Sequence, residues 1–439
     1  MFHLCFTLLV MYHILPNTGH GVQYPGAILR QQFLNQSHVR CVGSDLSNTS
    51  WFRNSCDYRN ACYSTLLQQF ILIDPLSLYA NSIQLRVSLT ATKTSRKKPN
   101  EEVKPGRINV FKMHAVHDIG WTQYQTTYWY PGTMLLTHPV FYTNFGHFFG
   151  DELWPLFKLL QQHRRLKSRV HILTMEPKNW KYGSCDKEIK KNNLLSPKTN
   201  MCLRFRHIRR HIWPSDSVLN VSLVENNTLY CAESIVAGVG FSSDHCHDLT
   251  NHGRHEYREL EHICNFGLSE QFNGFRDFLL SRFRIKPVAR LITAKVTIGM
   301  NLPTSRARVL KDGLIKLVAH VNAMFNDSSM YCMPIQVDRF NMAALSMRKQ
   351  LEVVSSTAIF VVAAGGGSYI SLCLPDWGTR IIFYDLADIP HDTHLYSQVH
   401  PSTTVYVQVN ASVMHKDVSK AIHNSLLKFC YWHNDASVM

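Results

Sequence analysis

The sequence lacks several features that would assign it quickly to a class of protein. After residues 2–15, no apolar run is long enough to cross a bilayer. The chain has 46 Lys and Arg against 31 Asp and Glu, yet no recognisable nucleic-acid-binding motif accompanies this excess, and no internal repeat is present. We therefore expect neither a nucleic-acid partner nor a membrane span beyond an N-terminal segment.

Two common catalytic patterns are also missing. The zinc-protease pattern HExxH is absent, and no nucleophile elbow suggests a serine hydrolase, so a secreted hydrolase ranks low. The segment Asp244–Glu256 is rich in metal-ligand residue types, but their spacings match no zinc pattern. We therefore predict that the protein has no metal site.

The composition is that of a globular protein: 45% of the residues are apolar and 18% are charged. A chain of 439 residues favours two domains of ordinary size. The basic excess favours anionic partners such as nucleotides or acidic glycans. It is spread in short bursts within polar stretches, which is also typical of solvated loops.

The N-terminus predicts entry into the secretory pathway. Phe2–Leu15 has the length of a signal-peptide apolar region, Pro16 ends it, and Gly19-His20-Gly21 supplies a small-x-small cleavage pattern. A basic n-region is missing, so an uncleaved anchor stays the alternative. Eleven cysteines remain after Cys5, and they predict disulfides with at least one free thiol. The candidate free cysteine is Cys373, and a Cys185–Cys202 bridge is one candidate pair. Glycosylation sequons support exposure to the lumen and occur at Asn35, Asn48, Asn220, Asn226, Asn326 and Asn410.

Strand and helix patterns become regular only after Pro287. Earlier, the sequence predicts a strand over 82–90, a strand over 170–173 and a helix over 257–283. Later, strands alternate with helices, as in a doubly wound α/β domain of roughly 120 residues. The strands are expected at 289–293, 335–337, 357–363 and 380–384, and the helices at 306–325, 343–354, 368–373 and 418–431.

A glycine run follows the continuously apolar strand predicted at 357–363. Gly365, Gly366, Gly367 and Ser368 stand where a buried strand turns into a helix. Backbone amides at a helix start are unpaired, and without Cβ atoms a diphosphate can approach them closely. The run predicts an anion cradle; a tight turn without a ligand is the alternative.

A second constellation spans residues 144–157, NFGHFFGDELWPLF. On a helix capped by Asn144, His147 and Asp151 are four residues apart and share a face, so a carboxylate lies beside an imidazole as a candidate general base. The aromatic residues Phe145, Phe148, Phe149 and Trp154 are expected to shield this site from water. A capped core helix with a hydrogen-bonded histidine is the alternative.

These two segments together resemble family 61 glycosyltransferases, which include plant xylan arabinosyl- and xylosyltransferases and animal enzymes that add N-acetylglucosamine to proteins. Asn144, His147, Asp151 and Pro155 fit the family's early motif. Further similarities are Lys295 with Ser305–Arg308, the stretch Ser346–Leu351, and Leu372–Ile382. One departure stands out: Ala364 occupies the position of the family's histidine.

The resemblance implies a GT-B-like α/β fold in which two Rossmann-like domains face a cleft. The implied units are a signal peptide or anchor (1–21), an acceptor-side domain (22–285), a nucleotide-sugar domain (286–410) and a C-terminal helix (411–439). It implies an inverting transfer of a sugar from a nucleotide sugar, expected to be a UDP-sugar, to a glycan or glycoprotein acceptor. The expected location is the lumen of the endoplasmic reticulum or Golgi, or the outside of the cell after secretion. The chain has no D-x-D pattern, so no metal and no cofactor is expected.

Residue roles follow from the same resemblance. Asp151 is the first candidate for the base that deprotonates the acceptor, with His147 orienting or replacing it and Glu152 third. The leaving diphosphate is expected to bind Asn144, Arg306, Arg308, Arg348, Gly365, Gly366, Gly367 and Ser368. The rival interpretation is a lumenal binding paralogue that keeps the fold and has lost turnover, and the absent histidine favours it.

Overall fold

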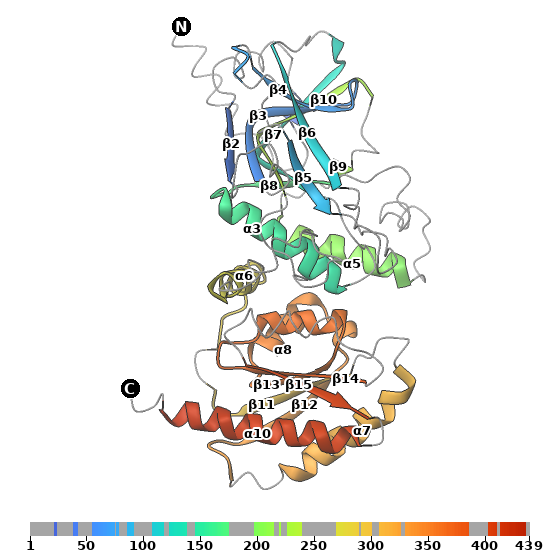
Figure 1. Ribbon diagram of the computed structural model, residues 1–439, viewed down its shortest axis with the longest axis vertical. Coiled ribbons are helices and arrows are strands. Elements are labelled where there is room, and N and C mark those ends of the chain that lie inside the picture. The colour runs from blue at the N-terminus through green and yellow to red at the C-terminus, as the bar shows by residue number, and fades with distance from the viewer. Residues whose placement is uncertain are drawn as a thin grey trace, which may run out of the picture.

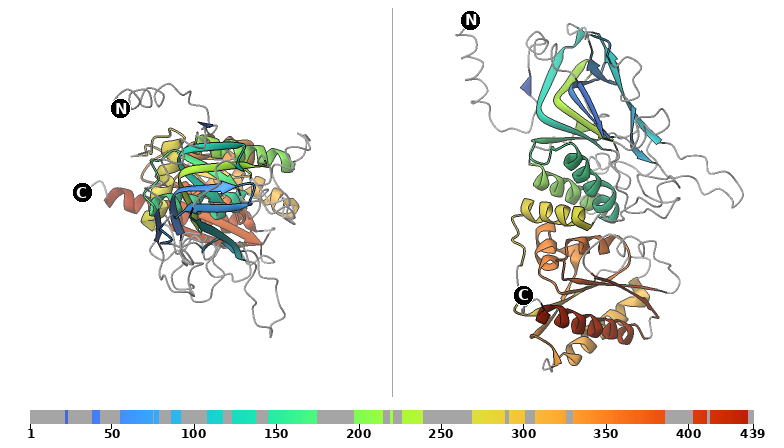
Figure 2. Two further views of the ribbon diagram at one scale, coloured as in Figure 1. Left: turned by 90° about the horizontal axis from the view of Figure 1, so that it is seen from above. Right: turned by 60° about the vertical axis from the view of Figure 1, so that its left-hand side comes forward.

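The computed structural model describes residues 22–23, 38–42, 55–74, 76–78, 86–91, 108–117, 123–137, 145–174, 197–214, 219–220, 226–238, 269–288, 291–300, 307–325, 330–385, 403–410 and 413–435. These residues form two β-sheets, one from each half of the chain, with a layer of helices between them (Figure 1). The right-hand view of Figure 2, turned by 60° about the vertical axis, shows the same order of layers.

The N-terminal half is built on a ten-stranded sheet of mixed direction. Its three longest strands are buried along most of their length, which suits their content of tyrosine, cysteine and branched residues. The strands are β1 (Val22–Gln23), β2 (His38–Val42), β3 (Ser55–Ser64), β4 (Gln69–Ile73), β5 (Arg86–Ala91), β6 (Ile108–Val116), β7 (Thr126–Thr137), β8 (Val170–Thr174), β9 (Leu219–Asn220) and β10 (Thr228–Gly238).

This sheet differs from the expected Rossmann-like first domain. The main path runs β5-β6-β4-β3-β10-β7-β8-β9. β3 pairs antiparallel with β2, β4 and β10, whereas β7 pairs parallel with β8 and β10. Antiparallel neighbours can be joined by short turns and need no crossover helix, whereas the Rossmann-like domain implied by the family resemblance would require parallel pairs. The strand predicted at 82–90 is confirmed as β5, which covers Arg86–Ala91 and so corresponds to the C-terminal part of the predicted range.

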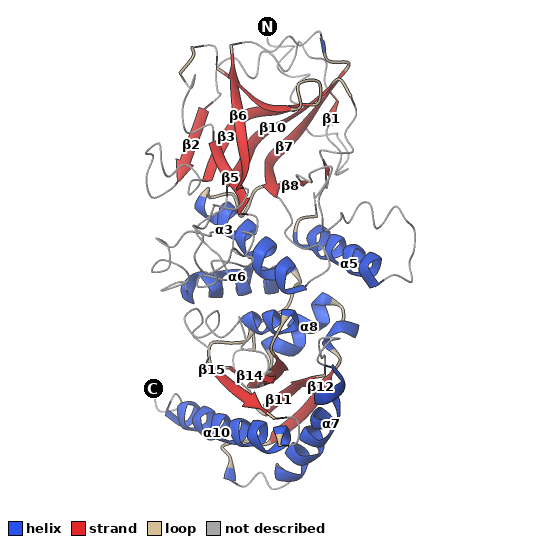
Figure 3. Cartoon of the chain, turned by 45° about the vertical axis from the view of Figure 1, so that its right-hand side comes forward, coloured by secondary structure: helices blue, strands red, loops and turns tan. Residues whose placement is uncertain are grey.

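Helices cover the edge of this sheet that faces the C-terminal half (Figure 3). They are the π-helix η4 (His147–Leu153), which continues into α3 (Trp154–Gln162), then α5 (Pro197–Ile212) and α6 (Ser269–Arg282). Pro155 lies in the first turn of α3, directly after the π-helical turn, and the chain stays helical through it. The part of the helix predicted at 257–283 that the structure describes is confirmed as α6.

The C-terminal half contains a five-stranded sheet in which every pair is parallel. Its order is β12-β11-β13-β14-β15. The doubly wound domain predicted from the sequence is thereby confirmed. Its elements are β11 (Ala294–Gly299), α7 (Ala307–Met324), β12 (Ile335–Phe340), the 3-10 helix η8 (Met342–Ala344), α8 (Met347–Ser355), β13 (Ile359–Ala363), the 3-10 helix η9 (Gly366–Cys373), β14 (Thr379–Asp385), β15 (Thr403–Val409) and α10 (Met414–Asp435).

Most of these elements lie where the sequence predicts them, but the first strand does not. The prediction placed it at 289–293, whereas β11 begins at Ala294 and Ile292 is 87% exposed. The Val-Ala-Arg-Leu-Ile stretch is apolar enough to suggest a strand, yet the β-branched residues that pair in the sheet come after it.

Alternate residues of β13 face two different cores. Ile359, Val361 and Ala363 pack with α7 and α10 on the outer face. Phe360 and Val362 face inward, where α8 and η9 join helices η4, α3, α5 and α6 of the other half in one continuous core. A strand buried on both faces in this way is typical of a parallel sheet. The two halves therefore share a hydrophobic core at their junction.

Three disulfides join described cysteines, as the cysteine count predicts. Cys41–Cys56 links β2 to β3, Cys62–Cys231 links β3 to β10, and Cys332–Cys430 ties the segment before β12 to α10. Disulfides of this kind fit a protein that folds in an oxidising, secretory-type compartment. Cys373 is confirmed as a free, buried cysteine, and burial raises the pKa of its thiol to about 12. Cys202 is also disulfide-bonded, and its expected partner Cys185 lies outside the described residues.

Within the described part of the chain, no helix combines the length and the apolar character that crossing a membrane requires.

A buried polar cluster lies between the N-terminal sheet and the turn that follows α3. The Asp57 carboxylate pairs with Arg165 at 2.8 Å and accepts a hydrogen bond from Ser234. The His163 Nε2 lies 3.0 Å from the Ser55 hydroxyl. Burial lowers the pKa of His163 to about 4, reinforced by Arg165, although Asp57 acts in the opposite direction. The folded protein therefore holds this imidazole neutral.

The protein is expected to lose stability as the pH falls from about 6.5 to about 4. In this window the unfolded chain protonates His163 and the folded chain does not, which lowers the free energy of unfolding by on the order of 3 kcal/mol. His163→Gln keeps a hydrogen-bonding partner for Ser55 and removes the titration. Urea unfolding at pH 5 and pH 7.5 should show a smaller pH difference for the variant, and equal differences would contradict this role.

Candidate functional site

The order of the C-terminal sheet identifies where a ligand is expected. From β11 the chain adds β12 on one side, and then β13, β14 and β15 on the other. The connections therefore reverse between β11 and β13, and open α/β sheets bind ligands outside the carboxyl ends of strands at such a switch point. Ala363 ends β13, and the glycine run follows it directly.

Gly365 shapes this loop through a conformation that only glycine adopts readily. Its φ of 130° and ψ of −173° would strain any residue with a Cβ atom. Its carbonyl oxygen accepts hydrogen bonds from the Ser368 amide at 2.9 Å and from the Ser368 hydroxyl at 2.7 Å. These two bonds fold the loop back on itself and start η9.

Gly366 and Gly367 form the start of η9, where Gly366 is half-buried and Gly367 is exposed. The Ser368 amide makes the first bond of this 3-10 helix, so the amides of Gly366 and Gly367 precede the intrahelical ladder. A Cβ atom built on Gly367 would have no atom within 4 Å, which means that this backbone faces open space. A ligand can therefore approach it without displacing protein atoms.

Ser368 has a different role from the one expected. Its side chain is fully buried, and its hydroxyl donates to Gly365 within the loop. We expected it to bind the donor phosphates, and the structure corrects this: Ser368 sets the shape of the loop. The polarity of a serine after three glycines predicts a ligand contact equally well, so the sequence alone could not separate the two roles.

The two segments singled out in the sequence meet at the junction of the halves. Gly146 is buried, and a Cβ atom on it would lie 2.8 Å from the Cα of Gly366 and 2.9 Å from the Tyr369 ring. The start of η4 thus packs directly on the glycine run, although more than 200 residues separate them along the chain. Gly146 is a site residue that the sequence analysis did not identify.

Gly146→Ala is expected to lower the free energy of unfolding by about 1–3 kcal/mol, because the added methyl group would collide with backbone that cannot move aside. Gly274→Ala in α6 is the matched control. There the added Cβ would lie 3.7 Å from the Phe157 ring, an ordinary contact, and alanine favours the helix by roughly 0.5–1 kcal/mol. Urea denaturation of both variants compares them; equal stability would show that the two halves do not pack as described.

The expected catalytic pair lies on η4. His147 and Asp151 both belong to this π-helix, four residues apart, which is close to one turn. Single π-helical turns within α-helices often occur at functional sites. The expected cap, Asn144, lies outside the described residues. The roles of His147 and Asp151 stay predictions.

Glu152, the third catalytic candidate, is placed in the interior. It is 4% exposed and forms an ion pair with Arg209 of α5, whose guanidinium lies 5.6 Å from the centre of the Phe148 ring. A buried carboxylate held by an arginine is not positioned to meet an incoming acceptor. We therefore assign Glu152 a structural role, contrary to the prediction.

The aromatic residues of the motif form the core of the junction. Trp154 stacks on Phe272 of α6 with ring centres 4.0 Å apart, and Phe148 stacks on Phe205 of α5 at 4.1 Å. Phe148, Phe149 and Trp154 are at most 1% exposed, and Phe145 is half-buried. They were expected to line a site, but they mainly hold the helices together beneath it. An open cleft between the halves stays a prediction.

The three candidate arginines differ in what the structure shows of them. Arg306 lies outside the described residues, and the backbone of Arg308 is in the first turn of α7, which follows the switch-point strand β11. Arg348 is exposed on α8, where its Nε pairs with Glu352 at 3.0 Å. This is an ordinary surface pair between residues four apart on a helix, and donor binding by Arg348 stays a prediction.

The stretch Ser346–Leu351 has a structural explanation. Ser346 caps α8 by accepting a hydrogen bond from the Lys349 amide. The buried Gln350 amide nitrogen donates to the carbonyl oxygens of Met342 at 2.6 Å and Leu345 at 3.1 Å. These contacts fix the turn between β12 and α8, and none of them points to a ligand.

Two arginines missed in the sequence connect the halves. Arg204 of α5 donates to the carbonyl oxygens of Ala343 and Leu345 around η8. Arg276 of α6 donates to the Leu374 carbonyl oxygen at 3.3 Å and to Asp376 at 2.5 Å. Nothing in the local sequence distinguishes them from surface arginines, because the residues that they contact in the other half lie 98 or more residues away.

Three of the six sequon asparagines lie in the described part of the chain. Asn226 and Asn410 are exposed in the structure, as glycosylation requires, and Asn220 ends β9. Asn35, Asn48 and Asn326 lie outside the described residues, as do the N-terminal apolar segment and the region Asp244–Glu256. Modification at these positions stays a prediction.

Comparisons with known proteins add little to these observations. No protein-family model matches the chain. No curated protein matches it at the sequence level. The solved structure of Escherichia coli heptosyltransferase WaaC with ADP-2-deoxy-2-fluoro heptose is similar over 66% of this chain and 99% of that chain, with a TM-score of 0.28 and 8% identity. At that TM-score the likeness carries no argument. The resemblance to family 61 stays a prediction from the quoted motifs, and the case for function rests on this chain's own residues.

Proposed function

We propose that the protein is an inverting glycosyltransferase that transfers a sugar from a nucleotide-sugar donor, with UDP-sugars as the first candidates, to a glycan or glycoprotein acceptor. One observation carries the proposal. The glycine run lies at the switch point of a doubly wound sheet and packs directly on η4, the helix with the carboxylate–imidazole pair. The proposal assigns donor binding to the glycine run and proton acceptance to η4.

The amides of Gly366 and Gly367 at the start of η9 would receive the donor diphosphate. Backbone amides at a helix start bind phosphate well, because the helix dipole and the unpaired hydrogens both favour negative charge. Arg308, and Arg306 before it, follow β11, the other strand at the switch point. Their charges would stabilise the leaving diphosphate, because catalysis of such a departure is largely electrostatic.

Asp151 would act as the base. Inversion occurs in a single displacement, so one group must remove the proton of the acceptor hydroxyl as the sugar bond forms. His147, four residues earlier on η4, would orient this carboxylate or share its proton. Because the sequence contains no D-x-D pattern, the proposal includes no resident metal and no cofactor.

The proposal assigns residues 22–285 to the acceptor side, 286–410 to the donor side and 411–439 to a closing helix. It places the protein in the lumen of the endoplasmic reticulum or Golgi, or outside the cell, in keeping with the disulfides and exposed sequons. A GT-B-like arrangement of the halves is part of the proposal.

A binding protein without turnover is the second candidate, and one observation favours it. Ala364 is 4% exposed and belongs to the junction core, where the resembling family carries histidine. If that histidine is needed for turnover, this chain would bind a nucleotide sugar without transferring the sugar.

A donor screen tests the proposal. The purified full chain would be incubated with individual nucleotide sugars, release of nucleoside diphosphate would be measured, and glycan acceptors would then be examined by mass spectrometry. Sugar transfer from one donor supports the glycosyltransferase, and saturable binding without release supports the binding protein. Absence of both with all common donors would refute both candidates.

A further inference from the structure

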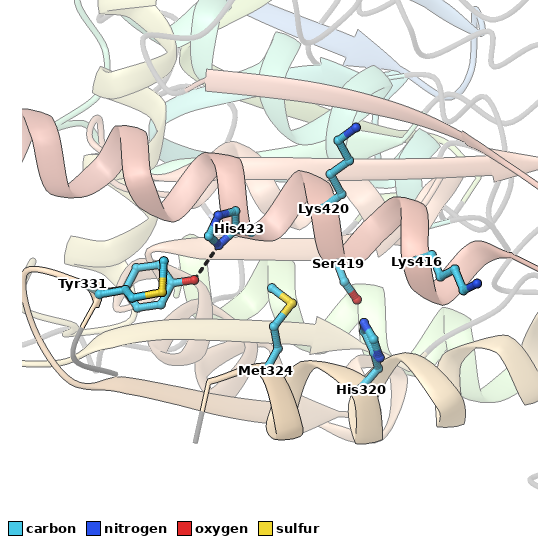
Figure 4. A pocket seen from close by; sticks show the side chains of 8 residues that line it. His320, Met324, Tyr331, Lys416, Ser419, Lys420 and His423 are labelled. Atoms are coloured by element: carbon cyan, nitrogen blue, oxygen red, sulfur yellow. Dashed lines mark hydrogen bonds between the residues drawn. The ribbon is translucent and has the colours of Figure 1, made fainter. Parts of the chain in front are cut away.

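A cavity of about 350 Å³ lies on the outer side of the C-terminal half, between α7 and α10. Its walls come from the last turns of α7, from residues 330–331 and from the first half of α10 (Figure 4). Both helices pack on the face of the sheet opposite the one that meets the N-terminal half. This cavity is therefore separate from the glycine run and η4.

The lining combines positive charge with apolar surface. Lys416 and Lys420 of α10 are exposed at its rim, and Figure 4 shows them extending outward from the helix. His320 and His423 add two imidazoles, while methionine side chains from α7 and residue 330 supply apolar contact. No aspartate or glutamate lies among the described residues that line the cavity. Such a lining attracts an anion and repels a cation.

The wall at Tyr331 is fixed in place. Its hydroxyl lies 2.6 Å from His423 Nδ1, and its ring packs edge-on against Phe325 at 5.4 Å. The next residue, Cys332, is joined to Cys430 of α10 by a disulfide. The cavity therefore exists before any ligand arrives, and less conformational entropy is lost on binding.

We propose that this cavity is a second ligand site, which binds a sugar ring bearing a carboxylate or sulfate group, such as the terminal acidic residue of a glycan. Its volume is at the lower end for ligand sites and suits one ring and its substituents. The ring lies against Tyr331 and the methionines, and the acidic group lies at the rim, where Lys416 and Lys420 supply positive charge. The inference does not depend on the proposed transfer reaction.

Titration of the full chain with glucuronate, N-acetylglucosamine 6-sulfate and glucose, followed by calorimetry, tests this site. We expect at least one acidic sugar to bind, and glucose to bind at least about tenfold more weakly, because hydrogen bonds to charged groups are the stronger ones. The two acidic probes distinguish carboxylate from sulfate as the preferred group. Equal affinity for acidic and neutral sugars, or no binding of either acidic probe, overturns the proposal.

Amino-acid substitutions test whether the acidic sugar binds in this cavity. The double variant Lys416→Ala/Lys420→Ala should bind the acidic sugar about tenfold more weakly. Met324→Trp should block binding by filling the cavity without a change of charge. Lys428→Ala, at another exposed lysine of α10, is the matched control and should bind normally. Undiminished binding by both the double variant and Met324→Trp, or competition by UDP, would place the acidic sugar elsewhere and overturn the assignment.

Discussion

Asp151→Asn is expected to lower the rate of sugar transfer by about 10²- to 10⁴-fold, the usual contribution of a general base. Asparagine has nearly the same shape as aspartate but cannot accept the acceptor's proton. Donor binding should be unchanged, because the donor diphosphate is assigned to the loop after β13 and not to η4. Transfer rates and UDP affinity would be measured on the same preparation.

The control for this variant is Asp338→Asn. Asp338 lies on the edge strand β12, where its carboxylate accepts hydrogen bonds from Gln336 and takes no part in the proposed site. It should transfer sugar at the normal rate. Normal transfer by Asp151→Asn would remove Asp151 from the mechanism, and loss of both transfer and UDP binding would show that its role is structural.

Gly367→Val is expected to weaken binding of the donor diphosphate between about 10- and 100-fold while leaving the fold intact. The isopropyl group would occupy the open space in front of the loop, where the phosphate oxygens are expected to meet the amides of Gly366 and Gly367. Hydrogen bonds to a charged ligand group contribute about 1.5–3 kcal/mol, which sets this range. UDP affinity and melting temperature are the two measurements.

Gly367→Ala provides a graded comparison. Its smaller methyl group should weaken UDP binding less than valine does, and both variants should melt near the wild-type temperature because no neighbouring atom is displaced. UDP affinity equal to the wild type in both variants would show that the diphosphate does not bind at this loop.

The C-terminal half could be predicted from sequence because its elements repeat in a regular order. Buried parallel strands such as β13 are short, continuously apolar and bounded by polar turns, and amphipathic helices such as α7 separate them. The glycine run could be predicted to follow a strand for the same reason. Local pattern was sufficient here because each strand is joined to the next through a helix.

The N-terminal half could not be predicted in this way. Its sheet brings together strands that are far apart in the chain, such as β3 with β10, whose paired residues Cys62 and Cys231 form a disulfide. Mixed pairing leaves no regular strand–helix rhythm in the sequence, and one face of β3 resembles the other because both are buried. Pairing of this kind is decided by tertiary contacts.

The two motifs of the candidate site could be predicted from the sequence, but the contact between them could not. The motif around His147 and Asp151 and the glycine run could each be found, but nothing local indicates that Gly146 touches Gly366. Likewise, Glu152 is an ordinary acidic residue in the sequence, and only Arg209, 57 residues later, makes it a buried ion pair. Contacts between distant segments decide which polar residues are available to a ligand.

The most direct test of the account is hydrogen–deuterium exchange of the full chain with and without UDP, measured on peptides that cover residues 360–374. We expect slower exchange at the amides of Gly366 and Gly367 when UDP is bound, because the diphosphate accepts their hydrogen bonds. Protection by UDP elsewhere in the chain, with exchange at these two amides unchanged, would contradict the assignment of the glycine run as the donor-binding loop.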